Sequence, residues 1–475
     1  MKLDRFHRTR FAVAMGGAVM SLAAGQALGS AFALQEQNAS GLGHAFAGGA
    51  AAAEDVSTIW FNPAGLVRLA TMQVVVAGNL ICPSAKFSDN GGSKPAAFQT
   101  LGGSGGDAGA CAGVPNLYLG VPFTDKWSFG LAVNVPFGLK TEYDTNWLGR
   151  FQAVKSEIKT INVNPALSYE VTKDLTIGAG VNWQKVDATL TNQVNWAALY
   201  AQGISGLVAN GTVPAAAAPT LIGAAAGIEA GAKIDGNDNA WGWNAGILWQ
   251  ATPSTRIGAS YRSSIKYTVN GSVNFSNPAV SQLGPLPPTL APVGALVANG
   301  VNAALVNGNV SLSLKVPDSA NISIFSTLND KWDVMADLQY TGWKSVQQLQ
   351  IVRSTGVVLN TLPENFRNTW RGSIGANYRY DDKWTIRGGL AYDQSPVNNT
   401  DRSPRLPDNN RTWIAFGTQY KWSPNWAIDV AYSYIFVQNP DINQNGGNQA
   451  GLGLISGSYK SNVNLLGAQV TYTFK

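Results

Sequence analysis

The stretch WSFGLAVNVPF, residues 127–137, has a large apolar residue at every second position. The apolar set consists of Trp127, Phe129, Leu131, Val133, Val135 and Phe137. The positions between them hold Ser128, Gly130, Ala132, Asn134 and Pro136. A period of two residues with one apolar face predicts a β-strand whose two faces meet different surroundings.

The same alternation recurs at residues 370–379 and 426–436. In a soluble β-sandwich the face opposite the core would carry charged residues, but here Gly, Ala, Ser and Asn dominate it. Only 13% of the chain is charged, while it contains 52 glycines and 15 tryptophans. Small polar residues suit the lumen of a barrel whose outer face lies in lipid. The pattern therefore favours an all-β transmembrane barrel over a soluble sandwich.

Short turns alternate with long loops along the chain. Three short turns are near repeats that end in tryptophan, at 124–127, 329–332 and 381–384, and three more lie at 171–174, 252–255 and 423–425. The long loops span 83–113, 138–155, 193–239, 277–308, 352–366, 396–411 and 438–458. This arrangement predicts fourteen antiparallel strands in residues 70–475, with both ends on the short-turn side, as in bacterial outer membrane barrels.

The N-terminus has the features of a secretory signal peptide. Four basic residues, Lys2, Arg5, Arg8 and Arg10, precede an apolar stretch at 11–24. Small residues then allow cleavage after Ala33, which would make residues 1–33 the leader, or after Gly29. Spacing alone does not choose between the two sites.

Net charge excludes one class of partner. The full chain carries +5, and removing the leader, with four positive charges and Asp4, leaves +2. A mature chain with so small a charge gives no reason to expect a nucleic acid partner. We expect the outer membrane as the location and its lipid and lipopolysaccharide as the surroundings.

Residues 34–69 precede the first strand and lack its alternation, so we expect them to form a plug in the lumen. Fourteen strands enclose more space than side chains alone would fill. Within this segment Asn62 can cap a short helix that starts at Pro63, where the missing N–H costs nothing. Asn62, Pro63 and Ala64 thus form a rigid turn just before the barrel.

At this point the chain resembles the FadL family of outer membrane transporters for long-chain fatty acids and other hydrophobic compounds. The resemblance begins with ASGLGHAFAGGAAAAEDVSTIWFNPAGL at 39–66, which is similar to that family's N-terminal hatch. Further similar blocks lie at 134–151, 161–171, 342–351 and 379–420. The resemblance implies a monomeric fourteen-stranded barrel with a hatch, an uptake function and a hydrophobic ligand.

The resemblance also implies a sideways exit. In the family the Asn-Pro-Ala turn lies against an inward kink of the third strand, and the kink opens a gap in the wall. Here the kink would comprise Asn134, Pro136, Phe137 and Gly138. Pro136 cannot donate to the ladder and Gly138 weakens it, although Pro136 could simply end the strand.

Two of the long loops are apolar, which is unusual for loops that face water. The apolar residues of 193–239 and 277–308 include Leu221, Ile222, Leu286, Leu290 and Leu296. Apolar surface of this kind indicates a binding site for a hydrophobic ligand, and the resemblance implies a capture groove here. The alternative is that the two loops pack on each other as a lid.

A fatty acid carboxylate buried in the lumen would need a cation. By alternation the inward candidates are Arg371, Arg379 and Arg387, each of which could instead belong to a charge network with a luminal aspartate. Fatty acid transporters of the family tend to carry a lysine at the position of Gln350. This departure leaves aromatic or alkane hydrocarbons as alternative cargo.

Enzymatic and metal-dependent functions find little support. GGSGG at 102–106 matches the nucleophile elbow formally, but no helix follows it and His44 is the only histidine after the leader. Two cysteines and one histidine do not form a metal site, so we expect no cofactor. Cys82 and Cys111 flank the first long loop at one rim, and we predict a disulfide between them.

We therefore carry three hypotheses from different classes. The first is passive uptake of hydrophobic molecules through a plugged barrel. The second is a surface adhesion or assembly protein that uses the apolar loops to bind a partner. The third, a lipase-like enzyme, is nearly excluded by the histidine count.

Overall fold

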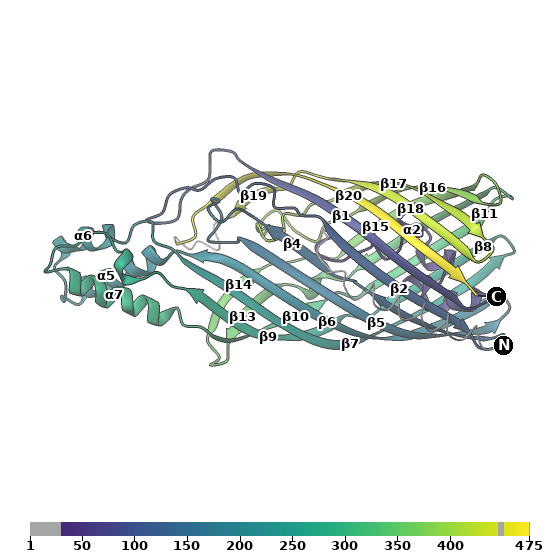
Figure 1. Cartoon of the computed structure of the whole chain (residues 1–475), viewed down its shortest axis with the longest axis horizontal. Coiled ribbons are helices and arrows are strands. Elements are labelled where there is room, and N and C mark those ends of the chain that lie inside the picture. The colour runs from purple at the N-terminus through teal and green to yellow at the C-terminus, as the bar shows by residue number, and fades with distance from the viewer. Residues whose placement is uncertain (1–29, 445–450, 475) are drawn as a thin grey trace, which may run out of the picture.

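The computed structural model describes residues 30–444 and 451–474 and consists of one closed antiparallel barrel (Figure 1). Its twenty strand segments make up fourteen barrel strands, because several are pieces of one interrupted strand. The first segment, β1 (Gln73–Asp89), pairs along its whole length with the last, β20 (Ile455–Thr473), and this pairing closes the barrel. The predicted transmembrane barrel is confirmed and the soluble sandwich is excluded.

The bounds of the strand segments show which are interrupted. Besides β1 and β20, the uninterrupted ones are β2 (Ala112–Pro122), β5 (Lys155–Thr172), β6 (Leu175–Val194), β7 (Ala230–Thr252), β16 (Trp384–Asp393) and β17 (Arg411–Ser423). The interrupted ones are β3 (Trp127–Asn134) with β4 (Gly138–Glu142), β8 (Thr255–Arg262) with β9 (Ile265–Ser276), β10 (Gly308–Val316) with β11 (Ser319–Thr327), β12 (Trp332–Thr341) with β13 (Gln348–Arg353), β14 (Val358–Pro363) with β15 (Thr369–Arg379), and β18 (Trp426–Val437) with β19 (Asp441–Gln444).

Large apolar side chains cover the outside of the wall. The exposed ones on strands include Ile161, Leu167, Ile177, Val181, Trp241, Ile247, Ile324, Ile374, Phe416 and Leu466. Lipid, unlike water, makes this exposure favourable. No helix in the described residues is long and apolar enough to cross a membrane.

The alternation at 127–137 holds only in part. Trp127, Phe129 and Leu131 face outward as predicted, but Val135 and Phe137 are buried, at 6% and 8% exposure. The assignment of Val135 and Phe137 to the outer face is therefore wrong. An extra residue in the third strand, described below, reverses which positions face inward.

The strands also extend further into the long loops than the sequence predicts. β1 runs to Asp89 although the loop was expected from residue 83, and β7 begins at Ala230 within the predicted loop 193–239. In the same way β4 lies inside the predicted loop 138–155. In the described residues the strands therefore extend the barrel further toward the external loops than the turn residues predict.

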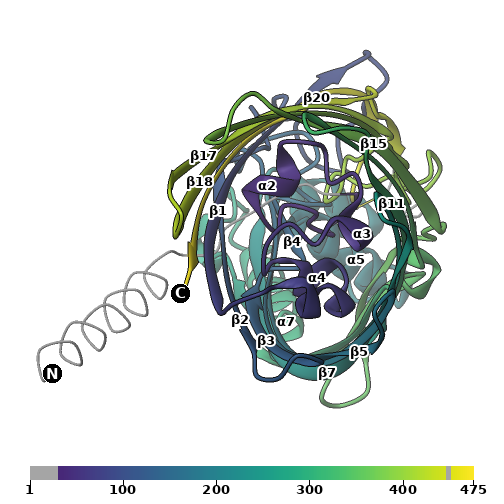
Figure 2. The same ribbon diagram turned by 90° about the vertical axis from the view of Figure 1, so that its right-hand side faces the viewer.

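The segment before β1 fills the lumen as four short helical turns (Figure 2). These are α2 (Ala39–Leu42), α3 (Gly49–Ala52), α4 (Thr58–Phe61) and the 3-10 helix η1 (Pro63–Arg68). Most of their residues are buried against the inner face of the wall. We call residues 38–69 the hatch.

Two long loops project from the end of the barrel opposite the C-terminal end of β20 and carry the longest helices (Figure 1). One loop contains α5 (Trp196–Ala209), η2 (Ala215–Ala217) and α6 (Ala218–Gly223), and the other contains η3 (Val280–Gln282) and α7 (Ala291–Ala304). Outside the hatch and these two loops, the described residues contain one further helical segment, η4 (Trp343–Ser345). The structure also joins Cys82 to Cys111 by a disulfide at the base of the first long loop.

Candidate functional site

The third strand is broken by a bulge. Asn134 of β3 pairs with Asn162 of β5, whereas Gly138 of β4 pairs with Lys159. Four steps along the third strand therefore correspond to three along β5, so the third strand contains one extra residue. Thr160 accommodates the bulge, because its Oγ1 accepts a bond from Phe137 N (2.9 Å) and donates one to Phe137 O (2.7 Å).

The bulge separates the third strand from β2. The ladder between β2 and β3 begins at Pro122 of β2 and ends where Leu117 pairs with Val133 of β3. Within the described residues, 112–116 of β2 pair with β1 alone, and β4 pairs with β5 alone. The wall therefore lacks ladder hydrogen bonds between β2 and β4.

The start of the described chain occupies the inner side of this break. Leu34 N donates to Pro136 O (2.8 Å), Gly138 N donates to Phe32 O (2.9 Å), and Ala33 forms an antiparallel bridge with Phe137. We call residues 30–37 the N-terminal segment. It supplies the backbone partners that the kink does not find in β2.

Apolar packing and side-chain bonds hold the N-terminal segment in place. The Phe32 ring lies 4.7 Å from Trp343 and 5.9 Å from Phe137, centre to centre. Ala31 N donates to Asp408 Oδ2 at 3.0 Å. Further along, the Gln37 side chain donates to Val135 O and accepts from Asn134 Nδ2. The segment thus closes the break from the inside.

The Asn62-Pro63-Ala64 turn lies elsewhere on the wall. Asn62 Oδ1 accepts from Ala64 N (3.0 Å), and its amide donates to Ala50 O and to Ile247 O of β7. Ala64 O accepts from Ser168 of β5 and Thr176 of β6. Among the hydrogen bonds of the described residues, none joins this turn to residues 134–138. The hydrogen bonds of the turn therefore go to β5, β6 and β7, and the direct contact that the resemblance implies stays a prediction.

A small inner cavity of about 70 Å³ separates the turn from the kink. Trp60 and Pro63 of the hatch, and Pro136 and Phe137 of the kink, line its sides. Arg262 of β8 lies over the Trp60 ring at 3.7 Å and donates to Trp60 O. The turn and the kink therefore face one cavity without touching through hydrogen bonds.

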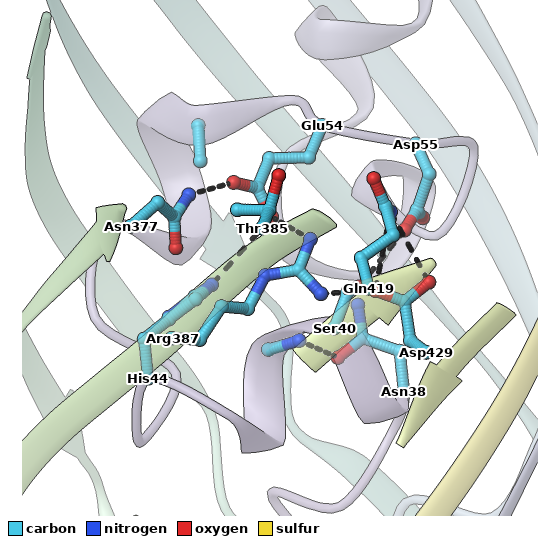
Figure 3. Close-up of polar contacts among 12 residues, drawn as sticks. Asn38, Ser40, His44, Glu54, Asp55, Asn377, Thr385, Arg387, Gln419 and Asp429 are labelled. Carbon is cyan, nitrogen blue, oxygen red and sulfur yellow. Dashed lines mark hydrogen bonds and ion pairs between the residues drawn. The ribbon is translucent and has the colours of Figure 1, made fainter. Parts of the chain in front are cut away.

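Arg387 ties the hatch to the wall through charge (Figure 3). Its guanidinium pairs with Asp429 of β18 and lies 3.4 Å from Glu54 of the hatch. Glu54 also lies 3.6 Å from His44. Burial alone would raise the pKa of Glu54, but Arg387, His44 and Asn377 together outweigh it and lower the pKa to about 2. Glu54 therefore stays charged and attracted to the wall.

The other two candidate arginines also have protein partners. Arg371 is buried and donates to Ala45 O of the hatch at 2.7 Å. Arg379 pairs with Asp333 near a short turn and is 35% exposed. None of Arg371, Arg379 and Arg387 lines the cavities described here. The structure thus places them in contacts within the wall and hatch, and their role toward a ligand stays a prediction.

An outer cavity of about 410 Å³ lies between the long loops and the barrel rim. Its walls are largely apolar and include Phe151, Val194, Leu199, Val273, Phe275, Leu305, Leu359 and Leu362. Two ionisable side chains, Arg405 and Glu364, also line it. A cavity of this size that combines apolar side chains with polar groups is typical of sites for amphipathic or hydrophobic ligands.

Arg405 has no carboxylate within ion-pair distance among the described residues. It is 6% exposed, donates to Lys155 O (3.2 Å) and Ser156 Oγ (3.0 Å), and leaves its Nε without a partner. Burial raises the pKa of Glu364 to about 8 against the opposing charge of Arg405. At neutral pH the cavity therefore holds a positive guanidinium beside a mostly protonated carboxyl.

The five predicted groove residues lie outside this outer cavity. Leu221 is fully buried in the helical core between α5, α6 and α7, with Ile222, Leu286 and Leu290 packed against it. Leu296 is 65% exposed. The two apolar loops therefore pack on each other, and Ala198, Leu199 and Leu305 at their base contribute to the cavity.

Sequence reasoning missed several functional candidates. Residues 32–34 were assigned to the leader or its edge, so their pairing with the kink was not expected. Arg405 and Glu364 were missed because both lie in loops, where alternation says nothing about direction. Pro115 offered a usable signal, since a proline inside β2 marks a stretch without a neighbour on one side.

A closed barrel with a lipid-facing belt, a filled lumen and an apolar cavity defines an outer membrane transporter of hydrophobic compounds. Residues 20–474 match the family described as outer membrane protein transport protein (OMPP1/FadL/TodX), and the chain belongs to that family. The family consists of transport proteins, and this chain is a transport protein and not an enzyme.

Two relatives from other bacteria align with this chain over nearly its whole length. The long-chain fatty acid transport protein of Escherichia coli (strain K12) is 29% identical over 446 residues, covering 92% of this chain and 94% of the relative. Outer membrane protein P1 of Haemophilus influenzae (strain Rd) is 30% identical over 446 residues, covering 91% and 90%.

Solved structures show the same fold. A crystal structure of a Pseudomonas aeruginosa FadL homologue has a TM-score of 0.80 and 27% identity, covering 94% of this chain and all of the other. The P. putida toluene transporter TodX has a TM-score of 0.62 at 19% identity, covering 88% and 94%. At that identity TodX supports the fold alone.

Glu36 of the N-terminal segment generates a prediction about pH. It is fully buried, and neither carboxylate oxygen has a hydrogen-bond partner. Burial raises its pKa to about 7, against the attraction of Arg411 and Arg371. Between the ordinary pKa near 4.5 and about 7, the folded protein holds a proton that the unfolded chain releases.

Stability should therefore fall as pH rises through this window, by up to roughly 3 kcal/mol. Glu36→Gln should remove that loss, so its advantage over the parent should grow from pH 5 to pH 8. Unfolding midpoints in detergent at several pH values would measure it, with exposed Glu142→Gln as the control. Parallel pH profiles for the parent and Glu36→Gln would contradict the prediction.

Proposed function

We propose that this protein carries out passive uptake of long-chain fatty acids across the outer membrane. Ligand is captured at the outer cavity, passes the inner cavity beside the hatch and leaves sideways between β2 and β4. The observation that carries the choice of cargo is the outer cavity itself, which combines about 410 Å³ of mostly apolar wall with the Arg405 guanidinium. The E. coli relative is a long-chain fatty acid transport protein, which agrees with this choice.

Arg405 supports a carboxylate ligand over a neutral hydrocarbon. A buried guanidinium without an acidic partner is costly, and a carboxylate would supply the missing charge and accept from the free Nε. Glu364, largely protonated beside it, would donate to the same group and would not repel it. Arg405 thus offers a cation in a chain that has Gln350 where fatty acid transporters of the family tend to carry lysine.

The sideways exit rests on the missing pairing between β2 and β4. Inside the membrane an open ladder edge is tolerated only where other groups satisfy it. Here the N-terminal segment does so through two backbone hydrogen bonds, to Pro136 and Gly138, that flank the bridge between Ala33 and Phe137. Release would require this segment to leave the kink, while the hatch, anchored on β5, β6, β7 and β16, could stay in place.

Locking the segment to the kink should stop transport. Ala33 and Phe137 are bridge partners, and such pairs lie close enough for a disulfide. In Ala33→Cys/Phe137→Cys, oxidation should reduce fatty acid uptake by cells to background, and reduction should restore it. Lys94→Cys/Leu454→Cys locks another isolated bridge and should transport in both states. Undiminished uptake by the oxidised first variant would place the exit elsewhere.

Removing the guanidinium should separate acids from neutral ligands. Arg405→Gln should weaken binding of a long-chain fatty acid by about tenfold or more, because charged hydrogen bonds contribute about 1.5–3 kcal/mol. Binding of the methyl ester of the same acid should change little. Tryptophan fluorescence titration would measure both ligands, and Arg353→Gln, at the end of β13 and outside the cavity lining, is the control. Unchanged acid binding would instead favour hydrocarbon cargo.

The N-terminal segment also bears on processing. Cleavage after Ala33 would remove Ala31 and Phe32, which are 0% and 4% exposed, and would leave Asp408 and the kink without their partners. We therefore propose residues 1–29 as the signal peptide, all of which lie outside the described residues. The intact mass of protein purified from outer membranes should correspond to a chain starting at Ser30. A mass that starts at Leu34 would refute this boundary.

A further inference from the structure

Two lysines of equal charge oppose each other on the outer face of the wall. Lys266 of β9 and Lys315 of β10 are directly paired in the ladder. Both are exposed, while their neighbours Ile265, Tyr267, Leu314 and Val316 are buried on the inner side. Like charges directly across a ladder repel each other, so the pair is unfavourable unless an anion lies between them.

A third lysine lies beside this pair. Lys344 is exposed on η4, next to Trp343, which is fully buried and faces inward. The adjacent Ser345 donates from Oγ to the carbonyl of Lys315 at 2.9 Å. The three lysines come from neighbouring strands and share one outer surface, which we call the lysine triad.

Unlike several other outward lysines of the wall, the lysines of the triad have no carboxylate partner. Lys140, Lys155, Lys159, Lys185 and Lys233 each lie within 3.2 Å of a carboxylate oxygen. Among the ion pairs of the described residues, none includes the triad. The nearest carboxylates in sequence or ladder are already engaged: Asp318 accepts from Tyr261 OH, and Asp238 accepts from Thr268 N.

The triad also lies at a boundary of the apolar belt. Asn237 of β7 pairs with Asn270 of β9. Four residues further in the same antiparallel register, Trp241 of β7 lies opposite Lys266 of β9. Trp241 is 66% exposed and Trp243 51%, as expected of aromatic side chains at a membrane interface. Since β9 and β10 continue from here toward the long external loops, the triad belongs to the outer-leaflet side.

We propose that the lysine triad binds the phosphate groups of lipopolysaccharide in the outer leaflet. Phosphate oxygens placed between Lys266 and Lys315 would turn their mutual repulsion into attraction, and Lys344 would contact the same or the second phosphate. The acyl chains would then lie along the apolar wall below. The site is independent of cargo, because it faces away from the lumen.

Purified protein titrated with bis-phosphorylated lipid A, followed by native mass spectrometry, tests the proposal. Lys266→Gln/Lys315→Gln/Lys344→Gln should bind lipid A about tenfold more weakly or worse, since each lysine near an anionic lipid surface adds to the attraction. Lys126→Gln/Lys383→Gln/Lys421→Gln removes the same charge from exposed short turns at the other end and should bind within about twofold of the parent.

Two further measurements distinguish the source of phosphate and the role of repulsion. Dephosphorylated lipid A and phosphatidylglycerol should show no difference between parent and triad variant. Without lipid A, Lys315→Gln should raise the unfolding midpoint in zwitterionic detergent, because it relieves the repulsion. Equal lipid A binding by parent and triad variant, equal weakening in both triple variants, equal weakening with phosphatidylglycerol, or a lower midpoint for Lys315→Gln would overturn the proposal.

Discussion

The requirement that every backbone N–H and C=O inside a bilayer finds a partner governs this structure. The pairing of β1 with β20 meets it by closing the barrel, and the ladder is complete around most of the wall. At the third strand the requirement is met differently, because residues 32–34 substitute for the missing pairs with β2. The wall is therefore sealed there by a segment that is not itself one of the barrel strands.

Charge divides the interior into a fixed part and a part that can move. Arg387, Arg371 and Arg256 from the wall bond to Glu54, Ala45 and Ala52 of the hatch, so moving the hatch would leave charged groups without their partners. The N-terminal segment is held mainly by neutral backbone bonds and by the Phe32 ring. A moving part with few charges can leave and return at lower cost than the hatch body.

Alternation and turn residues predicted the barrel, its strand number and its inside-out polarity, because these depend on local periodicity that any strand must obey. The break in the third strand was predicted from Pro136 and Gly138, but its partner was not, since pairing over a hundred residues leaves no local signal. The Asn62-Pro63-Ala64 turn was assigned to the kink by resemblance, whereas its bonds go to Ala50, Ser168, Thr176 and Ile247. Arg405 was missed because a loop side chain takes its direction from tertiary packing.

The single extra residue in the third strand has an effect on composition as well as on pairing. Beyond it the two faces exchange, so that Leu139 and Thr141 point inward and Lys140 and Glu142 point outward. Without the extra residue, Lys140 and Glu142 would point into the lumen. Thr141 points there instead and donates to the Arg405 carbonyl. The irregularity that opens the wall thus also keeps two competing charges away from the path of a hydrophobic cargo.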